Sequence, residues 1–210
     1  MKYYQDITLL PDAESALGFL WQKIYQQVHI ALVEQKVDDQ HSAIAVSFPN
    51  YGSKGFPLGN KLRLLAKEKG QLEKLNLARF LSRFEDYTHQ KSIQPVPEST
   101  SHVAFVRRRV KGQARIEKDM LDKALLWSKK SGQNLELCLQ QLEKSKPQIK
   151  QAPAFIWMES LETKTRNPMG SAKFPLFIER VELPEANEGL FNCYGLSAVR
   201  GEQIVSVPHF

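Results

Sequence analysis

The chain has 210 residues, 42% of them hydrophobic and 25% charged, and its 29 basic and 23 acidic side chains give a net charge of +6. This composition excludes a disordered chain, a collagen-like repeat and a disulfide scaffold, and the length allows one or two domains with an apolar core. Neither an apolar run long enough to span a membrane nor a signal peptide is recognised, so we expect a cytoplasmic protein. Cys138 and Cys193 are widely separated and are expected to be free thiols.

The first half of the sequence alternates between strand and helix patterns. In chain order, we expect a strand at Tyr3–Leu10, a helix at Leu17–Leu32, strands at Ala43–Phe48 and Leu62–Ala66, a helix at Gln71–Tyr87 and a strand at Val103–Val110. This β-α-β-β-α-β order is that of a ferredoxin-like fold. We therefore expect a ferredoxin-like domain at residues 1–97, with its fourth strand contributed from about 103–110.

The second half is less regular. Helices are expected at Glu117–Lys130 and Leu135–Leu142, and strands at Phe155–Met158, Phe174–Val181 and Leu190–Tyr194, with a polar loop between the first two strands. Residues 98–210 are thus expected to form an irregular α+β domain that carries a basic helix, and the whole chain is expected to be an α+β protein.

The positive charge is concentrated in one segment. Positions 103–130 hold three acidic residues and nine basic ones, namely Arg107, Arg108, Arg109, Lys111, Arg115, Lys118, Lys123, Lys129 and Lys130. Because side chains alternate along a strand, Arg107 and Arg109 should face one side and Arg108 the other. A basic segment on an otherwise neutral chain is typical of a protein that binds a polyanion such as RNA. The alternative is a solvated basic face on an edge strand protected by charge.

No metal site and no cofactor are expected. The five histidines are dispersed, and neither a metal-binding pair of closely spaced ligands nor a glycine-rich phosphate loop occurs. His29 follows Tyr25 by one helical turn, at the flank of the apolar stripe of the first helix. An imidazole at the edge of a groove suits proton transfer, although most histidines at such positions are ordinary boundary residues.

Several short motifs are distributed along the sequence. They are Asn192-Cys193-Tyr194-Gly195-Leu196-Ser197, Val207-Pro208-His209-Phe210, Val46-Ser47-Phe48-Pro49, Leu58-Gly59-Asn60-Lys61-Leu62-Arg63-Leu64, His29-Ile30-Ala31-Leu32-Val33, Lys173-Phe174-Pro175-Leu176-Phe177-Ile178 and Arg109-Val110-Lys111. Together, these motifs resemble the type I-F CRISPR precursor-RNA-processing endoribonuclease family, and the matching segments extend over nearly the whole chain. The resemblance implies a metal-independent enzyme that cuts CRISPR repeat RNA at the 3′ base of its stem-loop. It also implies that the protein stays bound to the mature guide RNA within a type I-F surveillance complex.

The same resemblance implies roles for individual residues. His29 corresponds to the catalytic histidine and Tyr194 to the active-site tyrosine, and a serine that holds the attacking 2′-hydroxyl is expected in the loop after residues 155–158. Ser160 is the first choice for this serine, with Thr165 and Ser171 as alternatives because the loop is longer than is usual in the family. Phe174 corresponds to the aromatic residue that stacks beside the cleavage site, and Arg109 to the arginine that reads the closing guanine.

RNA contacts are expected from the basic strand and helix. The expected residues are Arg107, Arg108, Arg109, Lys111, Arg115, Lys118, Lys129 and Lys130. Lys111 stands where the family commonly has a glutamine, and a lysine offers a point charge in place of a paired donor and acceptor. Acidic residues interrupt the helix, so its charged face is mixed in sign.

Two other functions remain open at this point. One is a catalytically silent RNA-hairpin-binding module similar to RNA-recognition-motif domains, since Val103-Ala104-Phe105-Val106 resembles a fragment of their aromatic strand. The other is an interaction protein that uses its basic patch on acidic partners, which would bind RNA weakly and without preference for a hairpin.

Overall fold

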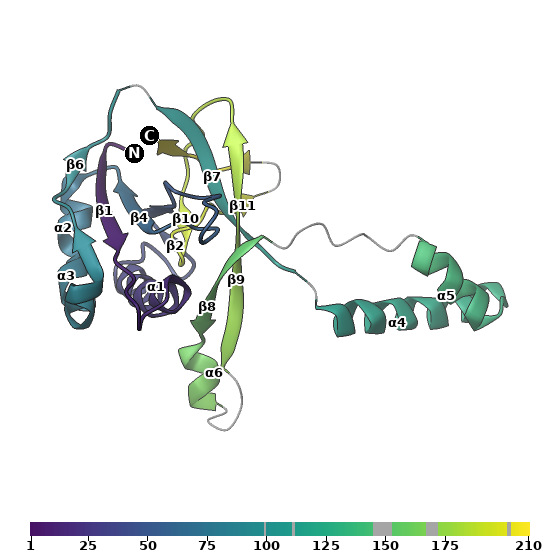
Figure 1. The fold of residues 1–210 in the computed structure, drawn as a ribbon. Coiled ribbons are helices and arrows are strands. Elements are labelled where there is room, and N and C mark those ends of the chain that lie inside the picture. The colour runs from purple at the N-terminus through teal and green to yellow at the C-terminus, as the bar shows by residue number, and fades with distance from the viewer. Residues whose placement is uncertain (99, 111, 145–152, 167–171, 201–202) are drawn as a thin grey trace. The chain divides into compact units, whose positions relative to one another are not determined.

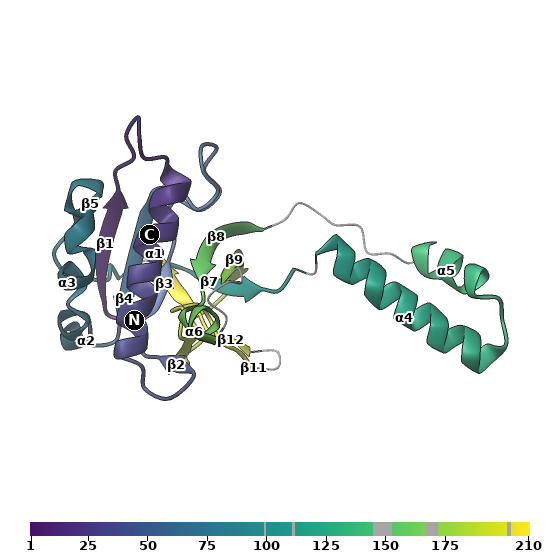
Figure 2. The same ribbon diagram turned by 90° about the horizontal axis from the view of Figure 1, so that it is seen from below.

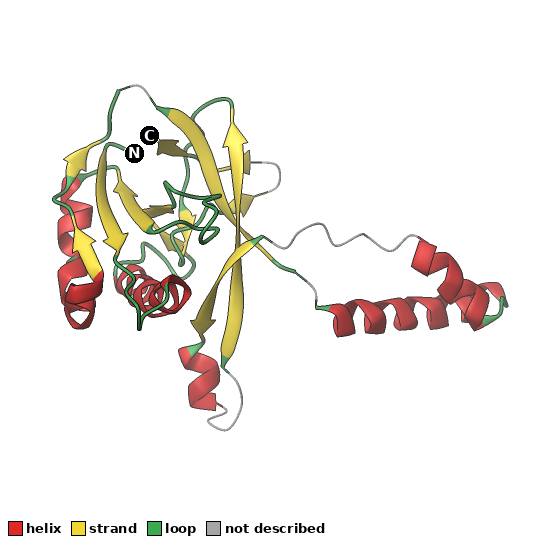
Figure 3. Cartoon of the chain, viewed as in Figure 1, coloured by secondary structure: helices red, strands yellow, loops and turns green. Residues whose placement is uncertain are grey.

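The computed structural model describes residues 1–98, 100–110, 112–144, 153–166, 172–200 and 203–210 (Figure 1). The chain divides into two units, of which the first comprises Met1–Arg108 with Pro153–Phe210 and the second Arg109–Ala152. The boundaries between the two units lie after residues 108 and 152. The domain boundary expected from the sequence lies at 97/98. The combination of helices with antiparallel sheets, coloured in Figure 3, confirms the predicted α+β class.

The first sheet of the larger unit has the strand order β3-β4-β1-β5, and β6 also pairs with β1. Its strands are β1 (Tyr3–Leu9), β3 (Ala45–Ser47), β4 (Lys61–Ala66), β5 (Thr88–Gln90) and β6 (Gln94–Pro95). All pairs are antiparallel. Helix α1 (Leu17–Glu34) follows β1 and buries the predicted apolar stripe, including Leu20, Trp21 and Ile24.

The second predicted helix is interrupted. In place of one helix at 71–87, the chain forms α2 (Lys69–Leu75), α3 (Leu77–Leu81) and the 3₁₀ helix η1 (Ser82–Tyr87). Asn76 adopts the left-handed conformation, with φ 45° and ψ 53°, and this conformation ends α2. The chain therefore changes direction at Asn76, so that Leu72 and Leu75 before it and Leu77 and Leu81 after it all reach the core.

The strand predicted at 103–110 lies in a different sheet from the one expected. It forms β7 (Ser101–Arg108), which pairs with β9 (Lys173–Leu183) and β13 (Val207–His209). The prediction that it supplies the fourth strand of the first sheet is wrong, because β5 and β6 already pair with the second edge of β1. The second sheet has the order β13-β7-β9-β8, with β8 at Ala154–Glu159.

Short elements complete the larger unit. β2 (His41–Ser42) pairs with β10 (Phe191–Asn192), β11 (Val199–Arg200) pairs with β12 (Gln203–Ile204), and α6 (Leu161–Arg166) follows β8. The predicted strand at 190–194 is thus limited to β10, since the chain turns after Asn192. Part of the loop predicted after β8 is the short helix α6.

One apolar core joins the two sheets. The ring of Phe48, which follows β3, lies 5.5 Å from that of Trp21 on α1 and 5.1 Å from that of Phe105 on β7. These three side chains are almost completely buried. Helix α1 therefore packs beside both sheets, as the view in Figure 2 shows.

The smaller unit contains two helices, α4 (Gln113–Ser131) and α5 (Leu135–Lys144), which agree with the two helices predicted there. Gly132, with φ 69°, ends α4 in the left-handed conformation that favours glycine. Ala124 and Cys138 are buried where the two helices pack together. Within the described ranges, no helix is long and apolar enough to cross a membrane.

Candidate active site

A cavity of about 420 Å³ brings four of the predicted site residues together. His29, Ser160, Phe174 and Tyr194 all line it, although they come from α1, the end of β8, β9 and the turn after β10. The remaining lining residues are Gln26, Ile30, Val33, Glu34, Met158 and Glu159. The cavity therefore lies where α1 packs against the β8–β9 hairpin.

The hydrogen bond of His29 defines its tautomer. Nδ1 lies 2.9 Å from the carbonyl oxygen of Cys193, and a carbonyl can only accept, so Nδ1 carries the proton and donates it. In the neutral ring, Nε2 then holds a free lone pair. The imidazole also stacks on Tyr194, with 4.4 Å between ring centroids and 11° between ring planes. The hydrogen bond at the edge of the ring and the stacking on its face together fix its orientation.

Burial lowers the pKa of His29 below the ordinary value of 6.5. The positive charge of Arg107 lowers it further, while the hydrogen bond to Cys193 acts in the opposite direction. The imidazole is consequently neutral at pH 7. A neutral histidine with a free Nε2 has the protonation state that a general base needs.

Tyr194 is held by a tight turn. The side-chain oxygen of Asn192 accepts hydrogen bonds from the backbone N–H groups of Tyr194 and Leu196, at 2.9 and 3.2 Å. The hydroxyl of Tyr25 donates to the carbonyl oxygen of Tyr194 at 2.8 Å. These bonds present both the ring of Tyr194 and the carbonyl of Cys193 to His29.

Ser160 follows the last residue of β8. Its Oγ accepts hydrogen bonds from the backbone N–H and the hydroxyl of Thr163, at 3.2 and 2.9 Å. A hydroxyl that accepts two bonds keeps its own hydrogen for donation to a further oxygen. Of the two alternatives, Thr165 lies exposed on α6, and Ser171 lies outside the described residues.

Arg107 brings positive charge to the aromatic side of the cavity. The centre of its guanidinium lies 5.1 Å from the centroid of the Tyr194 ring and 5.7 Å from that of Phe174. These distances are those of cation–π contacts. Phe174 is opposite Met158 in the β8–β9 pairing, which places its ring on the cavity side of the hairpin.

The other predicted RNA-binding residues lie elsewhere. Arg108 is exposed on the opposite face of β7, where it donates to Glu179. The smaller unit holds Arg109, Arg115, Lys118, Lys129 and Lys130, all of them exposed. Lys111 lies outside the described residues. At 100° per residue, Arg115, Lys118 and Lys129 share a side of α4 with Asp122, as the sequence indicates.

Supporting residues of the site were missed by the sequence analysis. Gln26 bonds to β8 twice, since it donates to the carbonyl oxygen of Glu159 at 3.3 Å and accepts from the N–H of Glu159 at 3.0 Å. Asn192 and Tyr25 hold the turn of Tyr194. The position of Gln26, one turn before His29, was the only signal available for it, and nothing local connects it to residue 159.

A neutral imidazole and a hydroxyl line one cavity, and a guanidinium lies beside two of its aromatic residues. In a chain with a basic strand and helix, this arrangement indicates the class of protein, a candidate nuclease. The chain matches the family model described as CRISPR-associated protein (Cas_Csy4) over residues 4–210. It therefore belongs to this family of CRISPR-associated endoribonucleases, and the predicted family membership is confirmed. The comparison with curated proteins found no match.

Proposed function

We propose that this protein cuts CRISPR repeat RNA at the 3′ base of its stem-loop, through attack of a 2′-hydroxyl on the neighbouring phosphate. The observation that carries the proposal is the neutral His29, whose Nδ1 is bonded to a carbonyl and whose Nε2 is free beside a cavity. The family match supports CRISPR-associated RNA processing as the setting.

In the proposed reaction, Nε2 of His29 removes the proton of the 2′-hydroxyl. The 2′-oxygen then bonds to phosphorus, the bond from phosphorus to the 5′-oxygen breaks, and the leaving 5′-oxygen takes up a proton. The products are a 2′,3′-cyclic phosphate and a 5′-hydroxyl. Ser160 is proposed to hold the sugar and Tyr194 to fix the imidazole plane, because the attack needs a nearly in-line geometry. No step requires a metal ion.

RNA binding is proposed to use the basic strand and helix together with Phe174. Arginine side chains clamp phosphate or read guanine edges with two hydrogen bonds, which suits Arg107 and Arg109. The exposed Arg108, Arg115, Lys118, Lys129 and Lys130, together with Lys111, are assigned to the RNA backbone, which makes residues 98–210 the main RNA-binding part. For residues 1–97 we retain the ferredoxin-like assignment, with β5 and β6 as the fourth strand.

After cleavage, the protein is proposed to remain bound to the mature guide RNA as a subunit of a type I-F surveillance complex in the cytoplasm. This part of the proposal rests on the family and on the size of the basic segment.

The test is incubation of the protein with a labelled repeat hairpin from its source genome in excess EDTA, beside His29→Ala. We expect one cut at the 3′ base of the stem, with a 2′,3′-cyclic phosphate end. Because general-base catalysis contributes about 10²–10⁴-fold, His29→Ala should lower the cleavage rate by at least about 100-fold while binding is retained. His89→Ala is the matched control, since His89 is exposed on β5 and does not line the cavity.

Other outcomes separate the alternatives. Tight hairpin binding without any cut would assign the chain to silent RNA-binding modules. Equal affinity for the hairpin and its scrambled sequence would favour an interaction protein with a basic patch.

A further inference from the structure

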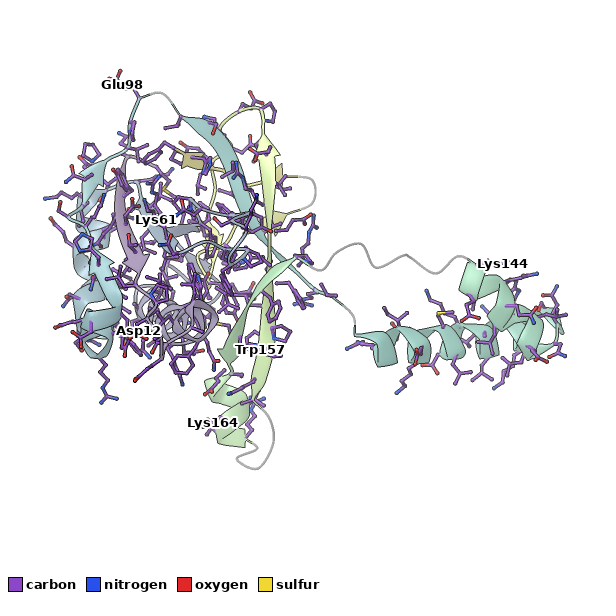
Figure 4. The ribbon with its side chains drawn as sticks, in the orientation of Figure 1. Asp12, Lys61, Glu98, Lys144, Trp157 and Lys164 are labelled. Atoms are coloured by element: carbon purple, nitrogen blue, oxygen red, sulfur yellow. The ribbon has the colours of Figure 1, made fainter. Side chains whose placement is uncertain are left out.

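The β8–β9 hairpin has a second face that the proposed cleavage reaction does not use. Ile156, Met158, Leu176 and Ile178 point to the core and cavity side and are buried. Phe155 and Trp157 alternate with them and point the other way, 40% and 46% exposed. Figure 4 labels Trp157 on this hairpin.

The strand register builds an ordered row on this second face. Arg108 of β7 is directly opposite Phe177 of β9, and Phe177 is directly opposite Phe155 of β8. Directly opposite residues of antiparallel strands share a face. The ring of Phe155 lies 5.5 Å from that of Phe177 and 5.6 Å from that of Trp157. We call Arg108, Phe155, Trp157 and Phe177 the aromatic face.

Positive groups border the aromatic face. Arg108 lies at one end, and Lys164 and Lys173 lie at the other, where each has its Nζ 3.9 Å from a carboxylate oxygen of Glu159. At this distance, and with side chains 64% and 55% exposed, both lysines are weakly held and remain available to phosphates. Among the described strands, β8 is also the last of its sheet, and Gln26 of α1 bonds to its outer edge at Glu159.

We propose that the aromatic face binds the unpaired RNA segment on the 3′ side of the hairpin stem by stacking bases on Trp157 and Phe155. This inference rests on the proposed function, since a strand that passes the cavity on one face of the hairpin reaches the aromatic face by crossing the edge strand β8. Exposed aromatic side chains on a sheet, with cations beside them, are how proteins hold single-stranded RNA with little sequence preference.

RNA is favoured over an apolar protein partner by the charges beside the aromatic face. Lys164 and Lys173, both more than half exposed, stand at one end of it, and Arg108, which is paired with Glu179, stands at the other. The face lies on the side of the hairpin opposite the cavity, because Arg107 and Arg108 are successive residues of one strand that point to the two sides. A purely apolar protein surface would gain nothing from these charges.

The experiment compares affinities for two hairpins that carry a 2′-deoxy nucleotide at the cut position and therefore cannot be cleaved. One ends at the base of the stem, and the other continues into a short 3′ flank of unpaired adenosines. We expect the flank to strengthen binding to the wild-type protein about tenfold, in line with one or two stacked bases. In Trp157→Ala and Phe155→Ala, this advantage should fall to about twofold or less, whereas Trp157→Phe should retain most of it.

Phe19→Ala is the matched control, because Phe19 is an aromatic residue 52% exposed on α1 and is not part of the aromatic face. It should keep the full advantage of the flank. An equal affinity of the wild-type protein for both RNAs would overturn the inference and leave the proposed function intact. Self-association of the wild-type protein that Trp157→Ala abolishes, without an effect of the flank, would make the face a protein interface and also overturn it. Absence of any hairpin binding would overturn both proposals.

Discussion

At the scale of single residues, the chemistry of the candidate site depends on the surroundings of His29. Its ring is held by the carbonyl of Cys193 and the ring of Tyr194, and the guanidinium of Arg107 lies 5.1 Å from the centroid of that tyrosine ring. Burial is the main cause that lowers the pKa of the imidazole, and the hydrogen bond to Cys193, which orients the ring, acts in the opposite direction. Orientation and proton affinity are therefore linked in this site.

This linkage predicts a specific pH dependence. Because the pKa of His29 is lowered from 6.5, the neutral base persists to lower pH, and the acidic limb of the cleavage rate should lie below pH 6.5. Arg107→Ala removes the positive charge that adds to the effect of burial in lowering this pKa, so the acidic limb should move upward toward pH 6.5. Single-turnover cleavage rates between pH 4.5 and 8 measure the position of this acidic limb. Arg107→Lys is the control variant, because it keeps the positive charge. A limb at the same pH in both variants would contradict the assignment.

The lowered pKa also has a consequence for stability. Between pH 6.5 and the lower folded-state pKa, the unfolded chain binds a proton at His29 that the folded chain does not. The contribution of His29 to stability is therefore complete above pH 6.5 and is lost as the pH falls through this window.

At the scale of elements, the turn after β10 connects the site to the core. Gly195 has φ 71°, and a Cβ at this position would lie 2.5 Å from Cγ2 of Val46. A side chain is thus excluded twice, by the backbone conformation and by the buried neighbour. The turn can present Tyr194 only because residue 195 is glycine.

Gly195→Ala should accordingly destabilise the protein more than Gly52→Ala. Gly52 also has a positive φ, 89°, but a Cβ there would meet nothing within 4 Å, so Gly52→Ala should cost only the backbone strain of about 1–2 kcal/mol. Urea unfolding measures both variants. Gly195→Ala should also slow cleavage, because the turn carries the carbonyl that bonds His29. Equal free energies of unfolding in the two variants would show that the close approach to Val46 does not add to the destabilisation.

At the scale of the whole molecule, Arg63 forms a buried ion pair within the first sheet of the larger unit and also contacts the end of the second sheet. Arg63 of β4 donates to both carboxylate oxygens of Asp6 on β1, at 2.6 and 2.9 Å, and also to the main-chain oxygen of Phe210, which follows β13. The side chains of Asp6 and Arg63 are each only 5% exposed. The guanidinium lies 3.8 Å from the centroid of the Phe210 ring, so this one side chain links the first sheet to the end of the second.

Removal of one partner of the Asp6–Arg63 ion pair should destabilise the protein. Asp6→Ala leaves Arg63 charged and buried, and we expect a loss of about 3–5 kcal/mol in the free energy of unfolding. The double variant Asp6→Leu/Arg63→Met should recover much of this loss, since it leaves no unpaired charge. Glu73→Ala, which breaks the exposed i,i+4 pair with Lys69, is the control and should have little effect. An effect of Asp6→Ala no larger than that of Glu73→Ala would contradict the role of the pair.

Local patterns in the sequence were sufficient to predict several helices and strands of this protein and its family. The apolar stripe of α1, the helices of the smaller unit and the opposite faces of Arg107 and Arg108 follow from periodicity, because a helix or a strand repeats over a few residues. The family could likewise be recognised from short motifs such as that around Tyr194.

Features that depend on contacts between distant parts of the chain could not be predicted from local patterns. The pairing of β7 with β9 and β13, the break at Asn76, and the bond of His29 to a carbonyl 164 residues away all arise from packing between remote segments. Ser160 lines the cavity because Gln26 fixes the end of β8 to α1, and no spacing in the sequence records that contact. Periodicity therefore specifies what each segment forms, whereas burial and long-range hydrogen bonds decide which segments meet and which protonation state the site holds.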